Sequence, residues 1–283
     1  MEFLMPIKEY VILNFIGRSG TTILRNELGK YKNICTLPTN IQAEILKKLS
    51  KDVYLYSNFI KYYISNDITN IFGKKKCYKR VEDINKFIYK MPLQTLLLYS
   101  DLDVIKRFTP ILIIREPIEN VISASQKKFV EVSDNYKLFL KKLEMVYSKF
   151  SLMLPKNLNV YLGQMEIIEQ RAILYKLAFK STLHYLNNIY KGKYLIIKFE
   201  NLLKQPVNVL SKILKFLNMD VSKKEILNKL NTNIYKDITE EGGIQMSSNL
   251  TSSHLNKYSN IDKDIRSKIE GILSEEIEFY NSL

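Results

Sequence analysis

A short turn early in the chain combines glycines, hydroxyls and one cation in an order suited to holding a phosphate. Residues 11–16 form an apolar run that predicts a strand buried on both faces. The string Gly17-Arg18-Ser19-Gly20 interrupts this run, and a helical pattern follows from Thr21. Glycines let successive backbone N–H groups point at an anion, and the N-terminus of the next helix adds partial positive charge. The turn is therefore predicted to bind a phosphate.

The residue order in this turn differs from that of the loops that bind Mg-ATP. Those loops carry a lysine directly after the second glycine, followed by the Ser or Thr that binds magnesium. Here Thr21 follows Gly20, and the cation, Arg18, comes two residues before that glycine. The turn is expected to suit a phosphate but not Mg-ATP. Taken alone, it could also be an ordinary connection between a strand and a helix.

A second arginine leaves a later strand of the same type. Residues 110–114 predict another strand buried on both faces, which ends at Arg115. Pro117 then opens a helix, and Ser123 lies about two turns along it. Arg115 by charge and Ser123 by a neutral hydrogen bond can both reach one dianionic group. An arginine that caps the helix beside an unrelated serine is the alternative.

In combination, the two strings resemble the phosphate-binding motifs of the sulfotransferase family, whose enzymes use 3′-phosphoadenosine 5′-phosphosulfate as donor. The resemblance covers about residues 10–260. It implies that Arg115 and Ser123 hold the donor's 3′-phosphate and that Arg18 stabilises the bridging oxygen as it leaves. It also implies that the donor's 5′-phosphosulfate is bound by Arg18, Ser19, Gly20, Thr21 and Thr22.

Three further strings follow in the family's order. Lys90-Met91-Pro92 resembles a Lys-Thr-Pro element, which implies that Lys90 adds a second catalytic charge. Phe199-Glu200-Asn201-Leu202 resembles a Tyr-Glu-Asp-Leu segment that follows a late strand. Ser252-Ser253-His254, followed by Lys257, is similar to a late loop near the donor, which implies that Lys257 binds the donor.

The general base does not follow from the resemblance. Family members keep either a Glu about twenty residues after the first motif's arginine, where this chain has Thr39, or a His between the motifs. His184 and His254 both lie after the second motif. Glu44, at the start of a predicted helix, is the expected base, and Glu82 is the alternative. Glu44 could equally be a solvated helical residue.

Composition bounds the possible partners. The 283-residue chain has 43 Lys and Arg against 29 Asp and Glu, a net charge of +14, which suits an anionic partner. Two cysteines and two histidines give no disulfide framework and no metal-ligand spacing, so no metal site is expected. No stretch has the apolar length of a transmembrane segment and no signal peptide is recognisable, so a cytoplasmic location is expected.

The element pattern predicts an α/β fold. Buried strands alternate with helical segments, which indicates a parallel β-sheet flanked by helices in a P-loop-like three-layer sandwich. In such sheets ligands bind at the carboxyl ends of the strands, where Arg18 and Arg115 both fall. A single domain over residues 1–283 is expected, with helical acceptor-binding segments near 40–75 and 125–190.

The sequence is therefore interpreted as a sulfotransferase that moves a sulfonate group to a hydroxyl, or an amine, of a carbohydrate, lipid or other small acceptor. The expected product of the donor is adenosine 3′,5′-bisphosphate. Two alternatives stay open at this point: a P-loop kinase that uses Mg-ATP, and a non-catalytic basic protein that binds nucleic acid. The dispersed charge and the absence of a base-reading motif argue against a nucleic-acid partner. No motif specifies the acceptor or the oligomeric state.

Overall fold

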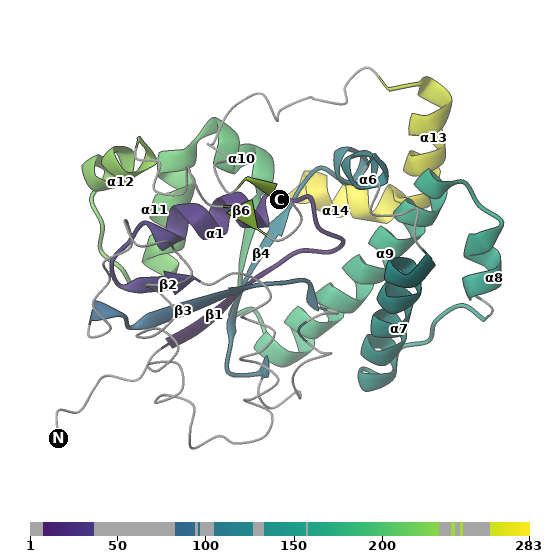
Figure 1. Ribbon diagram of the computed structural model, residues 1–283, viewed down its shortest axis with the longest axis horizontal. Helices are drawn as coiled ribbons and strands as arrows, with labels where there is room; N and C mark the ends of the chain where they lie inside the picture. Colours follow the sequence, from purple (N-terminus) through teal and green to yellow (C-terminus); the bar gives the residue numbers. More distant parts are fainter. Residues whose placement is uncertain are drawn as a thin grey trace.

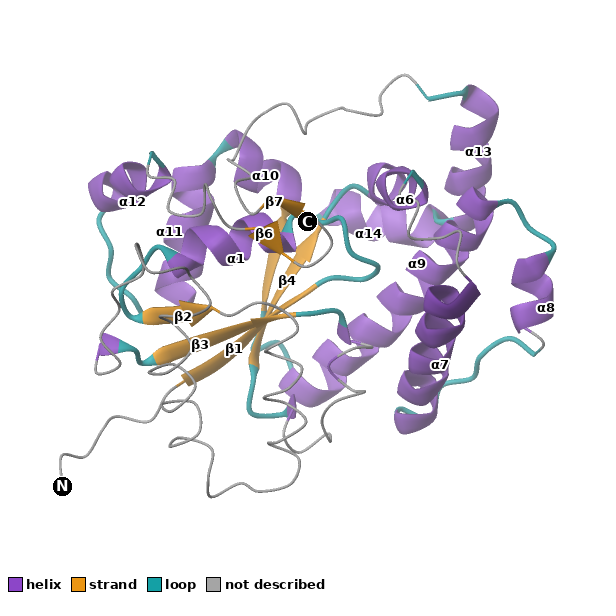
Figure 2. Cartoon of the chain, in the orientation of Figure 1, coloured by secondary structure: helices purple, strands orange, loops and turns teal. Residues whose placement is uncertain are grey.

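Five parallel strands form the centre of the computed structural model, and helices cover both faces of the sheet (Figure 1, Figure 2). The structure describes residues 8–36, 83–93, 96, 105–126, 133–156, 158–231, 239–240, 244–245 and 261–283. The strands lie in the order β2-β3-β1-β4-β5, with the bounds Ile34–Thr36, Lys86–Lys90, Lys8–Leu13, Thr109–Ile114 and Leu195–Lys198. A separate antiparallel pair consists of β6 (Thr239–Glu240) and β7 (Ile244–Gln245).

Side chains of alternate strand residues point to opposite faces of the sheet, so each face has its own core. On one face, Tyr10 and Ile12 of β1 are buried with Ile111 of β4. The helices that cover this face are α1 (Thr21–Gly29), α10 (Phe199–Lys204), α11 (Pro206–Phe216) and α12 (Lys223–Leu230).

The opposite face buries Val11 and Leu13 of β1. It is covered by α6 (Pro117–Ser125), α9 (Ile167–Tyr185), which continues as the π-helix η3 (Leu186–Tyr190), α13 (Lys263–Ile272) and α14 (Ser274–Ser282). The helices α7 (Ser133–Lys149) and α8 (Leu158–Gly163) pack against α9 through a third cluster that includes Leu143, Leu162 and Leu177. No helix in the described part of the chain is long and apolar enough to cross a membrane.

The register of the strands brings their carboxyl ends to one edge of the sheet. Ile12 of β1 is paired with Lys90 of β3, and Leu13 is paired with Leu112 of β4. The ends of β1, β3 and β4 therefore lie beside one another, and at these ends or in the turns that follow them lie Arg18, Lys90 and Arg115 of the sequence motifs.

The predicted fold class is confirmed: the chain is an α/β protein with a parallel sheet between helical layers. The strand bounds differ from expectation at β1, which begins at Lys8 and ends at Leu13 rather than spanning 11–16. The first two residues, Lys8 and Glu9, are charged and so do not match the apolar pattern of a buried strand. Glu9 is nevertheless buried, since its carboxylate accepts a hydrogen bond from Tyr89 and lies 3.3 Å from Arg107 Nη2.

Candidate functional site

The turn between β1 and α1 has a left-handed backbone at three of its four residues. The φ angles are 87° at Gly17, 59° at Arg18 and 78° at Gly20. This conformation costs a residue with a side chain roughly 1 kcal/mol or more, so the contacts around Arg18 must maintain it. No described side chain caps α1, and its first turn contains no acidic residue. The backbone N–H groups at this helix N-terminus are thus suited to an anion.

Asn120 of α6 holds this turn in place. Its Nδ2 donates to the backbone oxygen of Gly17 (3.0 Å) and to Ser19 Oγ (2.8 Å). Ser19 Oγ in turn donates to the same Gly17 oxygen (3.2 Å). Because Asn120 is fully buried, these bonds do not compete with bulk water. One side chain of the second motif's helix therefore fixes the shape of the first motif.

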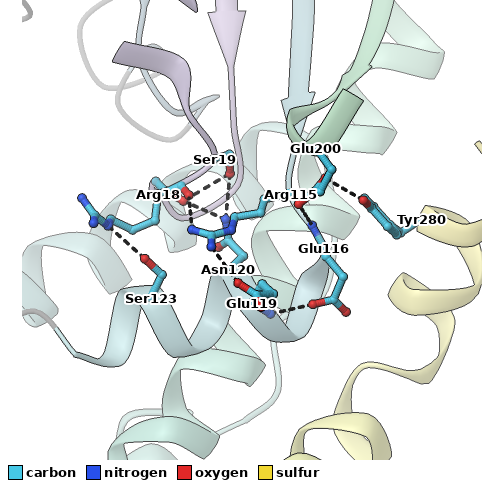
Figure 3. A network of polar contacts seen from close by, with 10 residues as sticks. Arg18, Ser19, Arg115, Glu116, Glu119, Asn120, Ser123, Glu200 and Tyr280 are labelled. Carbon is cyan, nitrogen blue, oxygen red and sulfur yellow. Dashed lines mark hydrogen bonds and ion pairs between the residues drawn. The ribbon is translucent and has the colours of Figure 1, made fainter. Parts of the chain in front are cut away.

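The two cationic motifs also meet through their arginines (Figure 3). Arg18 Nε donates to Ser123 Oγ at 3.3 Å, and Arg115 Nη1 donates to the backbone oxygen of Arg18 at 3.4 Å. Arg115 is buried and forms a 2.7 Å ion pair with Glu119 one turn along α6. The Arg18 side chain is exposed. Two guanidinium groups from separate strand ends thus share one site.

The third strand end contributes an ammonium group. Lys90, the last residue of β3, donates from Nζ to Thr22 Oγ1 at 2.8 Å. The neighbouring hydroxyl, Thr21 Oγ1, accepts a 3.5 Å hydrogen bond from Nδ2 of the buried Asn14, which directly follows β1. The hydroxyls at the start of α1 therefore lie between the carboxyl ends of β1 and β3.

The ring of Phe199 packs between the two motifs. A Cβ built on Gly20 would lie 2.2 Å from this ring, so only glycine permits such a close approach. The guanidinium carbon of Arg115 lies 5.6 Å from the ring centroid, within the range of a cation–π contact. Phe199 is the first residue of α10, and the packing of this helix therefore influences both cationic motifs.

Acidic side chains surround the turn that follows β4. Glu116 caps α6 by accepting from the Glu119 backbone N–H at 2.7 Å. Burial raises the pKa of Glu116, and the nearby carboxylates of Glu119 and Glu200 act in the same direction. The Glu116 backbone N–H donates to Glu200 Oε1 at 3.1 Å, and Tyr280 Oη donates to Glu200 Oε2 at 2.6 Å.

Comparison with known proteins assigns the chain to a family. A sequence model described as "Sulfotransferase domain" matches residues 9–276, which is nearly the whole chain. The chain belongs to the sulfotransferase family. Its activity is accordingly the transfer of a sulfonate group. A search of curated protein sequences found no significant match.

Solved structures share the fold of this sulfotransferase at low sequence identity. A sulfotransferase domain from the curacin biosynthetic pathway aligns with a TM-score of 0.51 and 15% identity, over 95% of this chain and 98% of that domain. The mouse sulfotransferase SULT7A1, in a structure described as complexed with PAP, aligns with a TM-score of 0.52 and 13% identity, over 96% of this chain and 86% of the mouse chain. These alignments support the fold of this chain.

The structure brings most of the expected site residues of this sulfotransferase to one edge of the sheet. They are Arg18, Ser19, Gly20, Thr21, Thr22, Lys90, Arg115 and Ser123. Ser123 Oγ accepts from Arg18 Nε, and the expectation that Ser123 and Arg115 bind the same phosphate stays a prediction. Glu44, Glu82 and Lys257 lie outside the described residues, as do all of 40–75 and part of 125–190. Among the residues described, no cluster of His, Cys, Asp or Glu is arranged as a metal site.

Sequence reasoning did not single out three residues of this site. Asn14 is a polar residue in an otherwise apolar run directly before the glycine-rich turn, and this signal could have identified it, whereas Asn120 lies among other polar residues of α6 and reaches the turn from 103 residues away. Tyr280 carries no comparable signal, because its contact with Glu200 joins residues 80 positions apart.

Proposed function

We propose that this sulfotransferase takes its sulfonate group from 3′-phosphoadenosine 5′-phosphosulfate and releases adenosine 3′,5′-bisphosphate. The observation that carries this proposal is the contact between the two cationic motifs through Arg18 and Ser123. A nucleotide with anionic groups at both the 5′ and 3′ positions requires two anion sites that adjoin. A donor with a single phosphate group would leave one of them unused.

The residues at the site suit such a donor. The 5′ group would lie on the backbone N–H groups of residues 17–22, with the hydroxyls of Thr21 and Thr22 beside it. The Ser19 hydroxyl donates to the Gly17 oxygen and accepts from Asn120, so Ser19 would bind the 5′ group through its backbone N–H. Arg115 and Ser123 would bind the 3′-phosphate, and Lys257 is retained as a donor ligand from sequence alone.

Catalysis would depend on fixed cations. When bound, the donor supplies the sulfonate group, whose sulfur forms a bond to the acceptor oxygen while its bond to the bridging phosphate oxygen breaks. Arg18 and Lys90 would stabilise the negative charge that gathers on the leaving oxygen. The acceptor's proton passes to a base, for which Glu44 is proposed and Glu82 is the alternative.

The acceptor is proposed to be a hydroxyl, or an amine, of a carbohydrate, lipid or other small molecule. Residues 40–75 and 125–190, within one domain spanning 1–283, are the proposed acceptor-binding segments. The presence of only two cysteines supports the proposal of a cytoplasmic location.

Transfer of sulfonate to water provides an assay that needs no known acceptor. The protein is incubated with donor carrying radiolabelled sulfonate, and the release of labelled sulfate is measured with and without a panel of hydroxyl compounds. Thermal unfolding is recorded in parallel with adenosine 3′,5′-bisphosphate, Mg-ATP and a DNA duplex. We expect stabilisation by the bisphosphate alone and labelled product above the protein-free rate. Stabilisation by Mg-ATP or DNA without any effect of the bisphosphate would overturn the proposal.

A further inference from the structure

The C-terminal helix α14 contacts the second cationic motif through a chain of hydrogen bonds (Figure 3). Tyr280 of α14 donates to one carboxylate oxygen of Glu200 at 2.6 Å. The other oxygen of Glu200 accepts from the backbone N–H of Glu116 at 3.1 Å. A single carboxylate on α10 therefore joins α14 to the turn that follows β4. Tyr280 lies beyond residues 9–276, the part of the chain that matches the family.

The Glu116 N–H belongs to the peptide group that directly follows Arg115. A hydrogen bond to this N–H fixes the plane of that peptide group, and so restricts the backbone on which the Arg115 side chain is mounted. From Glu116 the contacts continue to the guanidinium: the Glu116 carboxylate accepts from Glu119 N (2.7 Å), and the Glu119 carboxylate pairs with Arg115 Nη2 (2.7 Å). The hydrogen bond from Glu116 N–H to Glu200 thus restrains the backbone of Arg115, and the contacts through Glu116 and Glu119 restrain its guanidinium.

The protonation states favour this arrangement. Burial, followed by the Glu200 carboxylate, raises the pKa of Tyr280, so the phenol stays a donor at neutral pH. A carboxylate that accepts from both a phenol and an amide forms stronger hydrogen bonds than a neutral acceptor. Lys198 Nζ lies 4.4 Å from the Tyr280 ring centroid, which provides a cation–π contact on the ring.

We propose that Tyr280 and Glu200 are positioning residues that set the recognition of the donor's 3′-phosphate through Arg115. This inference rests on the proposed function, because it requires Arg115 to bind that phosphate. Neither residue touches the nucleotide itself. Because both act only through Arg115, they should change the affinity only for nucleotides that carry a 3′-phosphate.

The test is isothermal titration of the full chain with adenosine 3′,5′-bisphosphate and with adenosine 5′-monophosphate, which lacks the 3′ group. Tyr280→Phe and Glu200→Ala are each expected to weaken bisphosphate binding about tenfold, a change typical for loss of a hydrogen bond to a charged group. Binding of the monophosphate should change less than about twofold. Glu200→Gln should retain near-normal affinity, because its amide can still accept from Glu116 N–H while its NH₂ group donates to Tyr280 Oη.

Tyr194→Phe is the matched control, since its hydroxyl donates to Asn187 on the surface, away from Arg115. It should bind both nucleotides like the wild type. Adding Tyr280→Phe to Arg115→Ala should cause no further loss of bisphosphate affinity, because the residue through which it acts is gone.

Equal losses for the two nucleotides in Tyr280→Phe, or an unchanged ratio of the two affinities, would reduce Tyr280 and Glu200 to structural residues and overturn the inference. A wild-type protein with no preference for the bisphosphate over the monophosphate would instead overturn the proposed function. The two failures are therefore distinct.

Discussion

At the scale of single residues, the left-handed conformation of Arg18 is the feature that most needs a functional explanation. Its backbone is held by Asn120 and Ser19 through their contacts with Gly17, and its guanidinium reaches Ser123. A lysine or arginine on a regular helix could bind an anion without this cost. The strained position instead aims an exposed guanidinium from the first motif at the second.

Replacing Arg18 should therefore affect turnover more than donor binding. Arg18→Ala is expected to lower kcat about a hundredfold, because its charge matters most when the bridging oxygen becomes a leaving group. The donor Kd should rise less than about tenfold, since the loop N–H groups remain. Hydrolysis of labelled donor and titration with the bisphosphate measure the two quantities. Arg18→Lys keeps the charge and is the control; near-normal turnover in Arg18→Ala would make Arg18 a binding residue only.

Replacing Asn120 should weaken binding of the nucleotide's 5′-phosphate, whereas replacing Tyr280 should weaken binding of its 3′-phosphate. Asn120→Ala removes two hydrogen bonds that shape the Gly17–Gly20 turn, so binding of the bisphosphate and of adenosine 5′-monophosphate should weaken together, each about tenfold. Asn188→Ala, which removes an exposed bond to the His184 carbonyl, is the matched control for titration calorimetry. A loss of affinity for the bisphosphate alone would show that Asn120 supports binding of the 3′-phosphate at the second motif instead.

At the scale of elements, alanine substitutions of two glycines test how closely α10 packs against the turn between β1 and α1. Both Gly17 and Gly20 have positive φ, but no described atom lies within 4 Å of a Cβ built on Gly17, whereas one built on Gly20 meets the Phe199 ring at 2.2 Å. Gly17→Ala should cost about 1–2 kcal/mol of unfolding free energy, the penalty for the conformation alone. Gly20→Ala should cost about 1–3 kcal/mol more, from overpacking. Equal costs in urea unfolding would contradict the observed packing.

The buried start of β1 should make stability depend on pH. Burial raises the pKa of Glu9 from 4.5 to about 7, against the opposing effects of Arg107 and Tyr89. Because the folded protein holds this proton more tightly than the unfolded chain, the contribution of Glu9 to stability is fully present below about pH 4.5 and is lost as the pH rises to about 7. Glu9→Gln, which stays neutral, should gain up to about 3 kcal/mol relative to wild type between the two ends of this range. Denaturant unfolding of both proteins near pH 5 and near pH 8 tests this; a constant difference would contradict it.

At the scale of the whole molecule, the sequence predicts those features of the site that are set by residues close together in the chain. The turn at Gly17–Gly20 and the segment from Arg115 to Ser123 are recognisable because spacing and residue type define each within a few positions. The contacts that join these two segments cannot be recognised in the sequence, since Asn120 and Gly17 are 103 residues apart and Arg18 and Ser123 are 105 residues apart. The fold class follows from the apolar strands, whereas β3 has a lysine at each end and β2 has only three residues, so neither gives a clear periodic signal.

One strand end and the helix that follows it carry both Arg115 and Ser123, and their shared contact with a phosphate stays a prediction. In the folded chain, Glu119 lies one turn from Arg115 and pairs with its guanidinium, and Ser123 Oγ accepts from Arg18 Nε.

The central claim is that the two cationic motifs together bind a nucleotide with phosphates at both the 5′ and 3′ positions. Its most direct test is calorimetric titration of the wild type and of Arg115→Ala with adenosine 3′,5′-bisphosphate and with adenosine 5′-monophosphate. The wild type should prefer the bisphosphate, and Arg115→Ala should lose about 2–5 kcal/mol of binding free energy for it while its binding of the monophosphate changes little. Equal affinity of the wild type for the two nucleotides, or equal losses in Arg115→Ala, would contradict the account.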